Sequence, residues 1–254
     1  MKKLFAAAAV VAANSFRENV RNRFFTLFAV FAFTAIYASV LAGVMAVDQE
    51  GRVLADFGLV LMEFTALAYA LVSASSVLLK EAETKTIYLV FSRPVPRWAY
   101  LAGKLAGVML TSAFMLAVMG VMHLALLAFR GFPVPAYYGW ALAGSFLKLA
   151  IITAFAFFVS LFSTSTVSTL VISGILWTLG HFVSETRFLA EKAGGLAGAA
   201  LKAAAWLIPN FQLFNARDRS GAAGVLGAPA LFCAAAWICA SYLGALWLLR
   251  RKEF

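Results

Sequence analysis

Long uncharged stretches are the feature that most restricts how this chain can fold. From Phe24 to Val47 there is no acidic or basic side chain, and several later stretches are similar. A helix of about 20 apolar residues crosses the roughly 30 Å of hydrocarbon in a bilayer. The chain has 254 residues, of which 63% are hydrophobic and 13% are charged, whereas a soluble domain is about 45–50% apolar and about 25% charged. The sequence therefore predicts an all-α, polytopic membrane protein.

The charge and the cysteines fit this class. A formal net charge of +10 would suggest a nucleic-acid partner for a soluble protein. In a membrane protein, basic cytoplasmic loops and contact with anionic lipid explain it, so we expect the lipid bilayer and no nucleic acid as a partner. Cys233 and Cys239 lie in one apolar run, and we interpret them as small core or lipid-facing side chains, not as a disulfide or a metal pair.

Six transmembrane helices are expected. The predicted spans cover about residues 24–47, 57–79, 105–129, 138–162, 167–183 and 225–249. Residues 1–23 are predicted to form an interfacial helix, because apolar residues recur there at near-helical spacing beside Arg17 and Arg21. A secretory signal is the alternative, since a basic start precedes a short apolar region. Residues 185–224 form an outer loop, in which the apolar piece from Leu196 to Ile208 is too short to span and suits an interfacial or re-entrant helix.

The distribution of lysine and arginine predicts the orientation. With both termini inside, the inner segments carry thirteen Lys and Arg residues and the outer segments carry seven. Because cytoplasmic loops are enriched in basic residues, we expect a multi-pass protein of the cytoplasmic (inner) membrane with both termini cytosolic.

Motifs for catalysis are absent from the sequence. Gly103-Lys104 lacks the upstream glycine of a Walker A loop, so no phosphate cradle is encoded. Neither a zinc-protease motif nor a nucleophile elbow occurs, and two histidines are too few for a histidine-rich metal centre. We therefore expect a non-enzymatic chain with no metal and no cofactor of its own. An intramembrane enzyme is the least favoured alternative.

The charged arm between spans two and three, residues 80–104, carries the most specific pattern. Glu81, Thr86, a Pro94-Val95-Pro96-Arg97 segment and Gly103-Lys104 follow one another in it. This order resembles the permease subunit of ABC-2 type transporters, in which a Glu, a Gly-Thr, a Pro-x-x-Arg and a Gly-Lys occur between the second and third spans. Lys85 stands where that family usually has glycine. With the six-span layout, the resemblance covers essentially the whole chain, as a single ABC-2 type transmembrane domain over residues 1–254.

The resemblance implies one half of an ATP-driven machine. Two permease copies, most simply a homodimer, would pair, and each would dock an ATP-binding subunit that holds ATP and Mg. The arm would be the coupling helix, with apolar anchors such as Ile87 and Tyr88 seated in the partner and Pro94 ending the helix. Arg97 would pair with partner carboxylates or lipid phosphate. The coupling residues are then Glu81, Thr86, Ile87, Tyr88, Pro94, Arg97 and Lys104. On charge alone, a solvated loop held at the lipid headgroups is the alternative.

Glu63, His123 and Lys148 are ionisable residues inside predicted spans. A charge in lipid costs about 2.5–3.5 kcal/mol or more, so such groups usually face a bundle interior or water. They could line a polar pathway or form a gating ion pair, for example Glu63 with Lys148. The alternative is a purely structural pair, or snorkelling toward the outer headgroups.

The sequence thus predicts a permease subunit that moves a substrate, with export inferred from the resemblance. Two other functions stay open. A secondary transporter should show inverted repeats and broken spans, and no matching halves are visible. A membrane anchor or assembly protein could use the same arm without transport. The substrate is not specified, because spans of Ala, Leu, Val and Phe are what any helical bundle needs.

Overall fold

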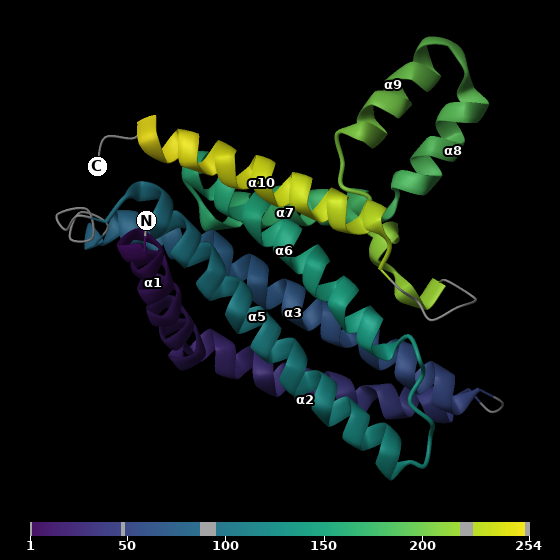
Figure 1. The fold of residues 1–254 in the computed structure, drawn as a ribbon. Coiled ribbons are helices and arrows are strands. Elements are labelled where there is room, and N and C mark those ends of the chain that lie inside the picture. Colours follow the sequence, from purple (N-terminus) through teal and green to yellow (C-terminus); the bar gives the residue numbers. More distant parts are fainter. Residues whose placement is uncertain (1, 47–48, 87–94, 219–225, 252–254) are drawn as a thin grey trace.

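The computed structural model describes residues 2–46, 49–86, 95–218 and 226–251, and in these ranges it contains helices and no strand. Figure 1 shows an elongated helical bundle with a helical hairpin beside it. The α-helices are α1 (Lys2–Arg21), α2 (Arg23–Val44), α3 (Glu50–Glu83), α5 (Arg97–Phe129), α6 (Tyr138–Phe162), α7 (Thr166–His181), α8 (Val183–Ala193), α9 (Gly195–Trp206) and α10 (Ala228–Arg251). Two short 3-10 helices, η1 (Phe211–Phe214) and η2 (Ala216–Asp218), precede α10.

Five helices are long and apolar enough to cross a membrane alone: α2, α3, α5, α6 and α10. The sixth candidate is α7, which has 16 residues and qualifies only together with α8, from which it is bent by 63°. The structure therefore agrees with an all-α membrane fold of five to six spans. The fifth predicted span is a short, broken helix.

Two helices are much longer than the predicted spans. Helix α3 has 34 residues and α5 has 33, which corresponds to about 50 Å each at 1.5 Å per residue. Both therefore project beyond the hydrocarbon layer. About half of the arm predicted at residues 80–104 belongs to these helices, and residues 84–96, here called the connector, join them.

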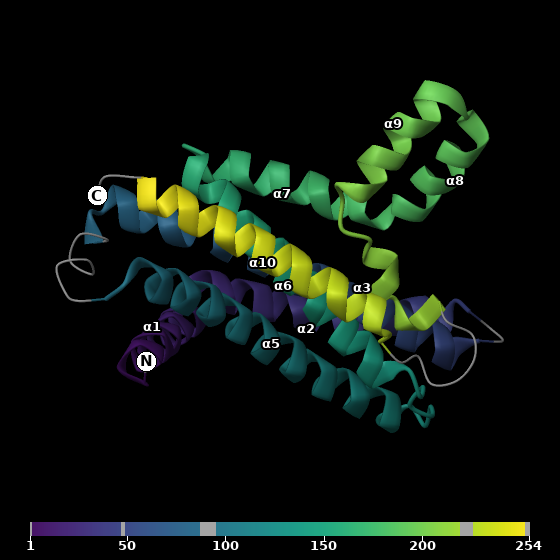
Figure 2. The ribbon, with the colours of Figure 1, turned by 45° about the horizontal axis from the view of Figure 1, so that its top comes forward.

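Helices α3 and α6 form the centre of the bundle. About 72% of the apolar window of α6 and 67% of that of α3 are buried, against 28% for α2 and 22% for α10. In Figures 1 and 2, α2, α5, α7 and α10 lie around these two helices. The outer helices present large apolar side chains to the surroundings, for example Phe31 of α2 and Phe232 of α10, as lipid contact requires.

Helix α1 packs across α5 through glycine. A Cβ at position 103 would lie 2.6 Å from Val11 Cβ and 2.8 Å from the carbonyl oxygen of Ala8. Gly107 meets Ser15 in the same way, one turn further along. The Gly103-x-x-x-Gly107 spacing thus lets the two backbones approach closely, while Arg17 of α1 stays exposed.

Helices α8 and α9 form a hairpin that stands away from the bundle in Figures 1 and 2. Its turn is made by Gly194 and Gly195, which have φ angles of 58° and 53°, a region that favours glycine. The sequence predicted one short helix near Leu196 to Ile208. The structure gives that helix as α9 and adds α8, whose mixed polar composition did not stand out as a helix in the sequence.

Candidate functional site

A buried ion pair joins the two central helices. Lys148 Nζ of α6 lies 2.7 Å from Glu63 Oε1 of α3, and these residues are only 1% and 5% exposed. Ser145 Oγ donates to the other carboxylate oxygen of Glu63 at 2.6 Å, and Lys148 also donates to Asn215 Oδ1 at 2.7 Å. An unpaired charge at this depth would be costly, so the pair and its two polar neighbours explain how both residues are buried. The structure thus brings together two of the three ionisable residues noted in the spans.

Asn215 reaches the pair because the chain re-enters the bundle after α9. Phe211 and Phe214 of η1 are buried. They pack against α7 and α6 at two glycines, Gly180 and Gly144. A Cβ at Gly180 would lie 2.5 Å from the Phe211 ring, and one at Gly144 would collide with the carbonyl oxygen of Phe214. Asn210 caps η1 by accepting a hydrogen bond from the backbone N–H of Gln212 at 3.1 Å. Sequence reasoning placed an interfacial or re-entrant helix earlier, from Leu196 to Ile208, which is α9, and it missed Asn215 as a partner of the pair.

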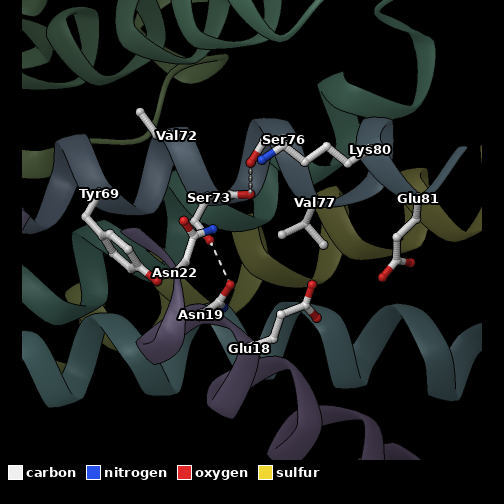
Figure 3. Close-up of a pocket in the computed structure, with 10 residues that line it drawn as sticks. All are labelled: Glu18, Asn19, Asn22, Tyr69, Val72, Ser73, Ser76, Val77, Lys80 and Glu81. Atoms are coloured by element: carbon white, nitrogen blue, oxygen red, sulfur yellow. Dashed lines mark hydrogen bonds between the residues drawn. The ribbon is translucent and has the colours of Figure 1, made fainter. Parts of the chain in front are cut away.

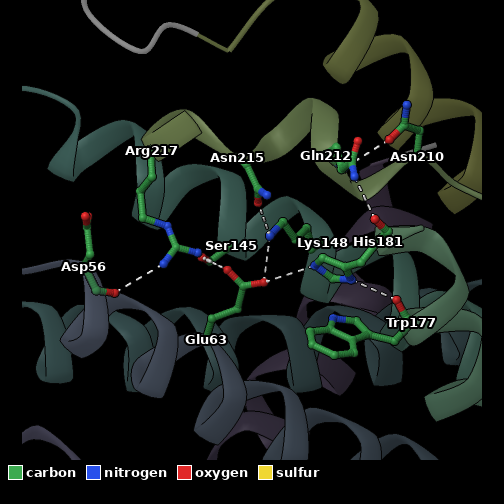
Figure 4. Close-up of polar contacts among 10 residues, drawn as sticks. All are labelled: Asp56, Glu63, Ser145, Lys148, Trp177, His181, Asn210, Gln212, Asn215 and Arg217. Atoms are coloured by element: carbon green, nitrogen blue, oxygen red, sulfur yellow. Dashed lines mark hydrogen bonds and ion pairs between the residues drawn. The ribbon is translucent and has the colours of Figure 1, made fainter. Parts of the chain in front are cut away.

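The ion pair borders an open pocket between α3, α6, α7 and η2, shown in part in Figure 4. Arg217 of η2 borders it and donates to the carbonyl oxygen of Asp56 at 3.2 Å. His181 Nε2 lies 4.0 Å from Glu63 Oε1, and the His181 ring packs against Trp177. The pocket is lined by Val60, Glu63, Phe64, Lys148, Trp177, Thr178, His181, Phe182, Asn215 and Arg217. Arg217, Trp177 and His181 were not among the predicted site residues.

Further side chains tie α3 to the connection between α5 and α6. Arg130 pairs with Glu50, and the Tyr137 hydroxyl donates to Asp56 Oδ1 at 2.6 Å. Burial, reinforced by this hydrogen bond and by the negative charge of Asp56, raises the pKa of Tyr137 to about 12. The phenol therefore stays neutral and donates throughout the physiological pH range.

His123, the third ionisable residue, lies apart from the pair. Its Nε2 is 3.3 Å from the carbonyl oxygen of Leu54 on α3, and its Nδ1 is 2.9 Å from the Tyr138 hydroxyl on α6. A Cβ at Gly58 would overlap the imidazole ring. The histidine is fully buried, and it joins α5 to both central helices, so its position is that of a structural residue.

A second polar cluster joins the helices on either side of the connector. Lys104 of α5 pairs with Glu81 of α3 and lies 3.7 Å from Glu18 of α1. The Tyr100 hydroxyl donates to the second oxygen of Glu81. Lys104 is 6% exposed and Tyr100 is fully buried. Glu18 and Glu81 also line a small polar pocket between α1 and α3 (Figure 3).

Arg97 makes hydrogen bonds within the chain. Its guanidinium donates to the carbonyl oxygens of Leu249 and Arg250 at 3.0 and 2.9 Å. These carbonyls belong to the last turn of α10, where helix carbonyls lack intrahelical partners and a cation is favourable. Tyr242 of α10 adds a hydrogen bond to the carbonyl oxygen of Trp98 at 2.8 Å. The start of α5 and the end of α10 are thus held together.

Residues 84–86, at the start of the connector, are exposed. Thr86 Oγ1 lies 3.0 Å from Thr84 Oγ1 and donates weakly to the carbonyl oxygen of Glu81 at 3.4 Å. Lys85 has a φ of 57°, a conformation natural for glycine and unfavourable for other residues, and this is the position where ABC-2 permeases usually carry glycine. Ile87, Tyr88 and Pro94, also predicted as coupling residues, lie outside the described residues.

The fold and these clusters define a multi-pass α-helical membrane protein with a charged pair at its centre and a short connector between its two longest helices. The family of ABC-2 family transporter proteins matches residues 49–249, which is most of the chain and runs from the start of α3 into the last turn of α10. The chain belongs to this family. A comparison with curated proteins gave no significant match.

Proposed function

We propose that this chain is the permease subunit of an ATP-driven ABC exporter. Two copies pair around the substrate pathway, and each docks a separate ATP-binding subunit that carries ATP and Mg. The chain lies in the cytoplasmic membrane with both termini and the connector on the cytosolic side. Family membership supports the ABC assignment, and the excess of Lys and Arg in the inner segments supports the orientation.

The observation that carries the proposal is the cluster of Glu81, Lys104 and Tyr100. It clamps the end of α3 to the second turn of α5, so a force applied to the connector moves both helices together. Helix α3 continues unbroken from Glu81 to Glu63, over about 27 Å at 1.5 Å per residue. A partner that pushes the connector therefore acts through one rigid element on the buried ion pair in the pocket.

This arrangement separates docking from transmission. Glu81, Lys104 and Arg97 are occupied by contacts inside the chain, and they serve to hold helices in place. Docking is assigned to the connector. Thr86 is exposed, and Ile87 and Tyr88 are the apolar anchors that would fit a groove on the ATP-binding subunit.

Co-purification tests the proposal. The full-length chain is purified in mild detergent from its native cells, as wild type and as the Ile87→Ser/Tyr88→Ser variant. The matched control is Phe188→Ser/Leu189→Ser, which removes two exposed apolar side chains on α8. An ATP-binding protein should accompany the wild type and the control and be lost from the connector variant. A wild type that brings down no ATP-binding protein would overturn the proposal.

A transport assay separates a permease from an anchor. The complex is compared with one whose ATP-binding subunit cannot hydrolyse ATP. Substrate export that stops in the second complex supports a permease. If cells that carry the inactive ATP-binding subunit show the same phenotype as cells with the active one, the chain is an anchor or assembly protein that uses the same connector.

A further inference from the structure

The pocket beside the ion pair contains a cation in excess. Glu63 is neutralised by Lys148, and its second oxygen accepts from Ser145. Arg217 lines the same pocket and, among the residues whose side chains the structure describes, pairs with no carboxylate within 4 Å. Its guanidinium donates a hydrogen bond to the backbone carbonyl oxygen of Asp56. A guanidinium has five N–H donors, so this bond uses one of them. Arg217 is therefore able to bind an anion.

The negative groups nearby are already occupied. The Asp56 carboxylate accepts from Tyr137 and pairs with Arg52 at 3.8 Å. His181 lies at the edge of the cluster, with Nδ1 directed to the carbonyl oxygen of Trp177 at 2.9 Å. Among the described residues that line the pocket, one carboxylate, Glu63, thus stands against two cations, Lys148 and Arg217.

A second observation points to a ligand. The indole Nε1 of Trp177 is buried and has no hydrogen-bond partner among the described residues, and Trp177 lines the same pocket. A buried donor without a partner costs free energy, and each such group in a folded protein calls for a partner such as water or a ligand. The Trp177 side chain and Arg217 thus border the same pocket, and both have N–H groups that a ligand could use.

Apart from Thr178, the remaining lining residues are apolar. Val60 and Phe64 of α3 face Phe182 at the end of α7 across the pocket, and the two phenylalanines are 49% and 55% exposed. The pocket therefore has a charged floor and an apolar, open rim. Such a surface matches a molecule with an anionic head and a hydrocarbon body, since a small hydrophilic anion would leave the rim without a partner.

We propose that this pocket binds the anionic headgroup of an amphiphile, a phosphate or a carboxylate, with Arg217 as the main ligand and the apolar rim in contact with the chain. The amphiphile is either a lipid of the surrounding bilayer or the transported molecule. The binding site stands on its own, and its role in transport rests on the proposed function.

Lipid retention measured by native mass spectrometry tests the site. Purified full-length protein is mixed with phosphatidylglycerol and phosphatidylcholine of identical acyl chains. Wild type should prefer the anionic lipid, and Arg217→Gln should lower that preference about tenfold, as expected for a lost charged hydrogen bond. Arg187→Gln on α8, exposed and outside the pocket, is the matched control and should behave as wild type. No preference in the wild type, or an unchanged one in Arg217→Gln, would overturn the proposal.

Two further variants guard against misfolding. Arg217→Lys keeps the charge without the planar fork and should retain part of the preference. Trp177→Phe should weaken binding of both lipids a few-fold and leave the preference for the anion intact. Retention of the full preference by every Arg217 variant that elutes as a single species would argue against the site.

Addition of ATP to the complex with its ATP-binding subunit identifies the source of the ligand. Release of the bound anionic lipid on hydrolysis indicates a transported amphiphile, and retention indicates a bilayer lipid. An anion preference without any co-purifying ATP-binding protein would leave the site in place and remove the proposed function.

Discussion

Lys104 and Glu81 form an ion pair that joins α5 to α3 on either side of the connector. Lys104 is 6% exposed, so replacement of Glu81 by Gln leaves a buried ammonium with only the longer, 3.7 Å contact to Glu18 as a counter-charge. We expect Glu81→Gln to destabilise the protein by roughly 3 kcal/mol, measured as unfolding in detergent. Glu83→Gln, two residues further along and exposed, is the control and should change stability by less than about 0.5 kcal/mol. Equal effects of the two variants would argue against a clamp.

The residues of this clamp show what the sequence could reveal. The order of residues in the arm identified Glu81 and Lys104 as functional candidates. They were predicted to bind a partner, however, and not each other. Their distance in sequence could not show that two long helices bring them together. Tyr100, which completes the cluster, was missed, because one tyrosine in an apolar helix carries no signal of its own. The class of fold was predictable, since uncharged runs of this length have few other uses.

Lys85 tests the local geometry of the connector. Its φ of 57° places Cβ close to the following carbonyl oxygen, a strain that glycine avoids. Lys85→Gly should stabilise the protein by about 0.5–1 kcal/mol. This is the net result of two effects, because glycine relieves the backbone strain but also gains conformational freedom in the unfolded chain. Lys85→Ala removes the same side chain without relieving the backbone. A thermal melt in which both variants gain equally would point to the side chain as the cause.

Gly103 tests the docking of α1. Any side chain there would meet Val11 and the backbone of Ala8, so Gly103→Ala should cost about 1–3 kcal/mol through overpacking. The control is Gly139→Ala in the first turn of α6, where no heavy atom lies within 4 Å of the added Cβ; it should be neutral or slightly stabilising.

Limited trypsin digestion reads out the same change locally. Arg21 and Arg23 are exposed at the junction of α1 and α2, and cleavage there should accelerate in Gly103→Ala alone. Identical digestion of the two glycine variants would mean that α1 does not rely on this contact.

Tyr137 predicts a dependence on alkaline pH. Its pKa is raised to about 12 from about 10 in an unfolded chain, so the phenol is neutral in both states below pH 10. Above pH 10 the unfolded chain loses its proton first, and the stability from the hydrogen bond to Asp56 is lost as pH rises toward 12. Wild type should exceed Tyr137→Phe by about 1 kcal/mol at pH 8, and the gap should narrow above pH 10. If the stability difference between wild type and Tyr137→Phe stays constant up to pH 12, the hydrogen bond from Tyr137 to Asp56 is not its cause. Tyr37→Phe, on the exposed face of α2, serves as the control.

Glu63 and Lys148 illustrate the other limit of the sequence. The rarity of charges inside spans was enough to pair them as a hypothesis. What surrounds the pair was not predictable, because Asn215 and Arg217 come from a segment about 70 residues further along that enters the bundle over Gly144 and Gly180. A contact of that kind depends on the path of the chain in space and leaves no periodic pattern.

The pair itself is best tested by a double-mutant cycle. Glu63→Gln and Lys148→Met each strand the other charge at a buried site, so each should cost roughly 3–5 kcal/mol. The double variant removes both charges and should be more stable than either single variant. The coupling energy in unfolding measurements is then larger than the cost of either single variant, that is, above about 3 kcal/mol. His123→Gln, combined with Glu63→Gln, is the control and should be additive, because His123 bonds to Leu54 and Tyr138 and not to the pair. Additive losses for Glu63 and Lys148 as well would mean that the two charges are stabilised separately, and the central helices would then be held by packing alone.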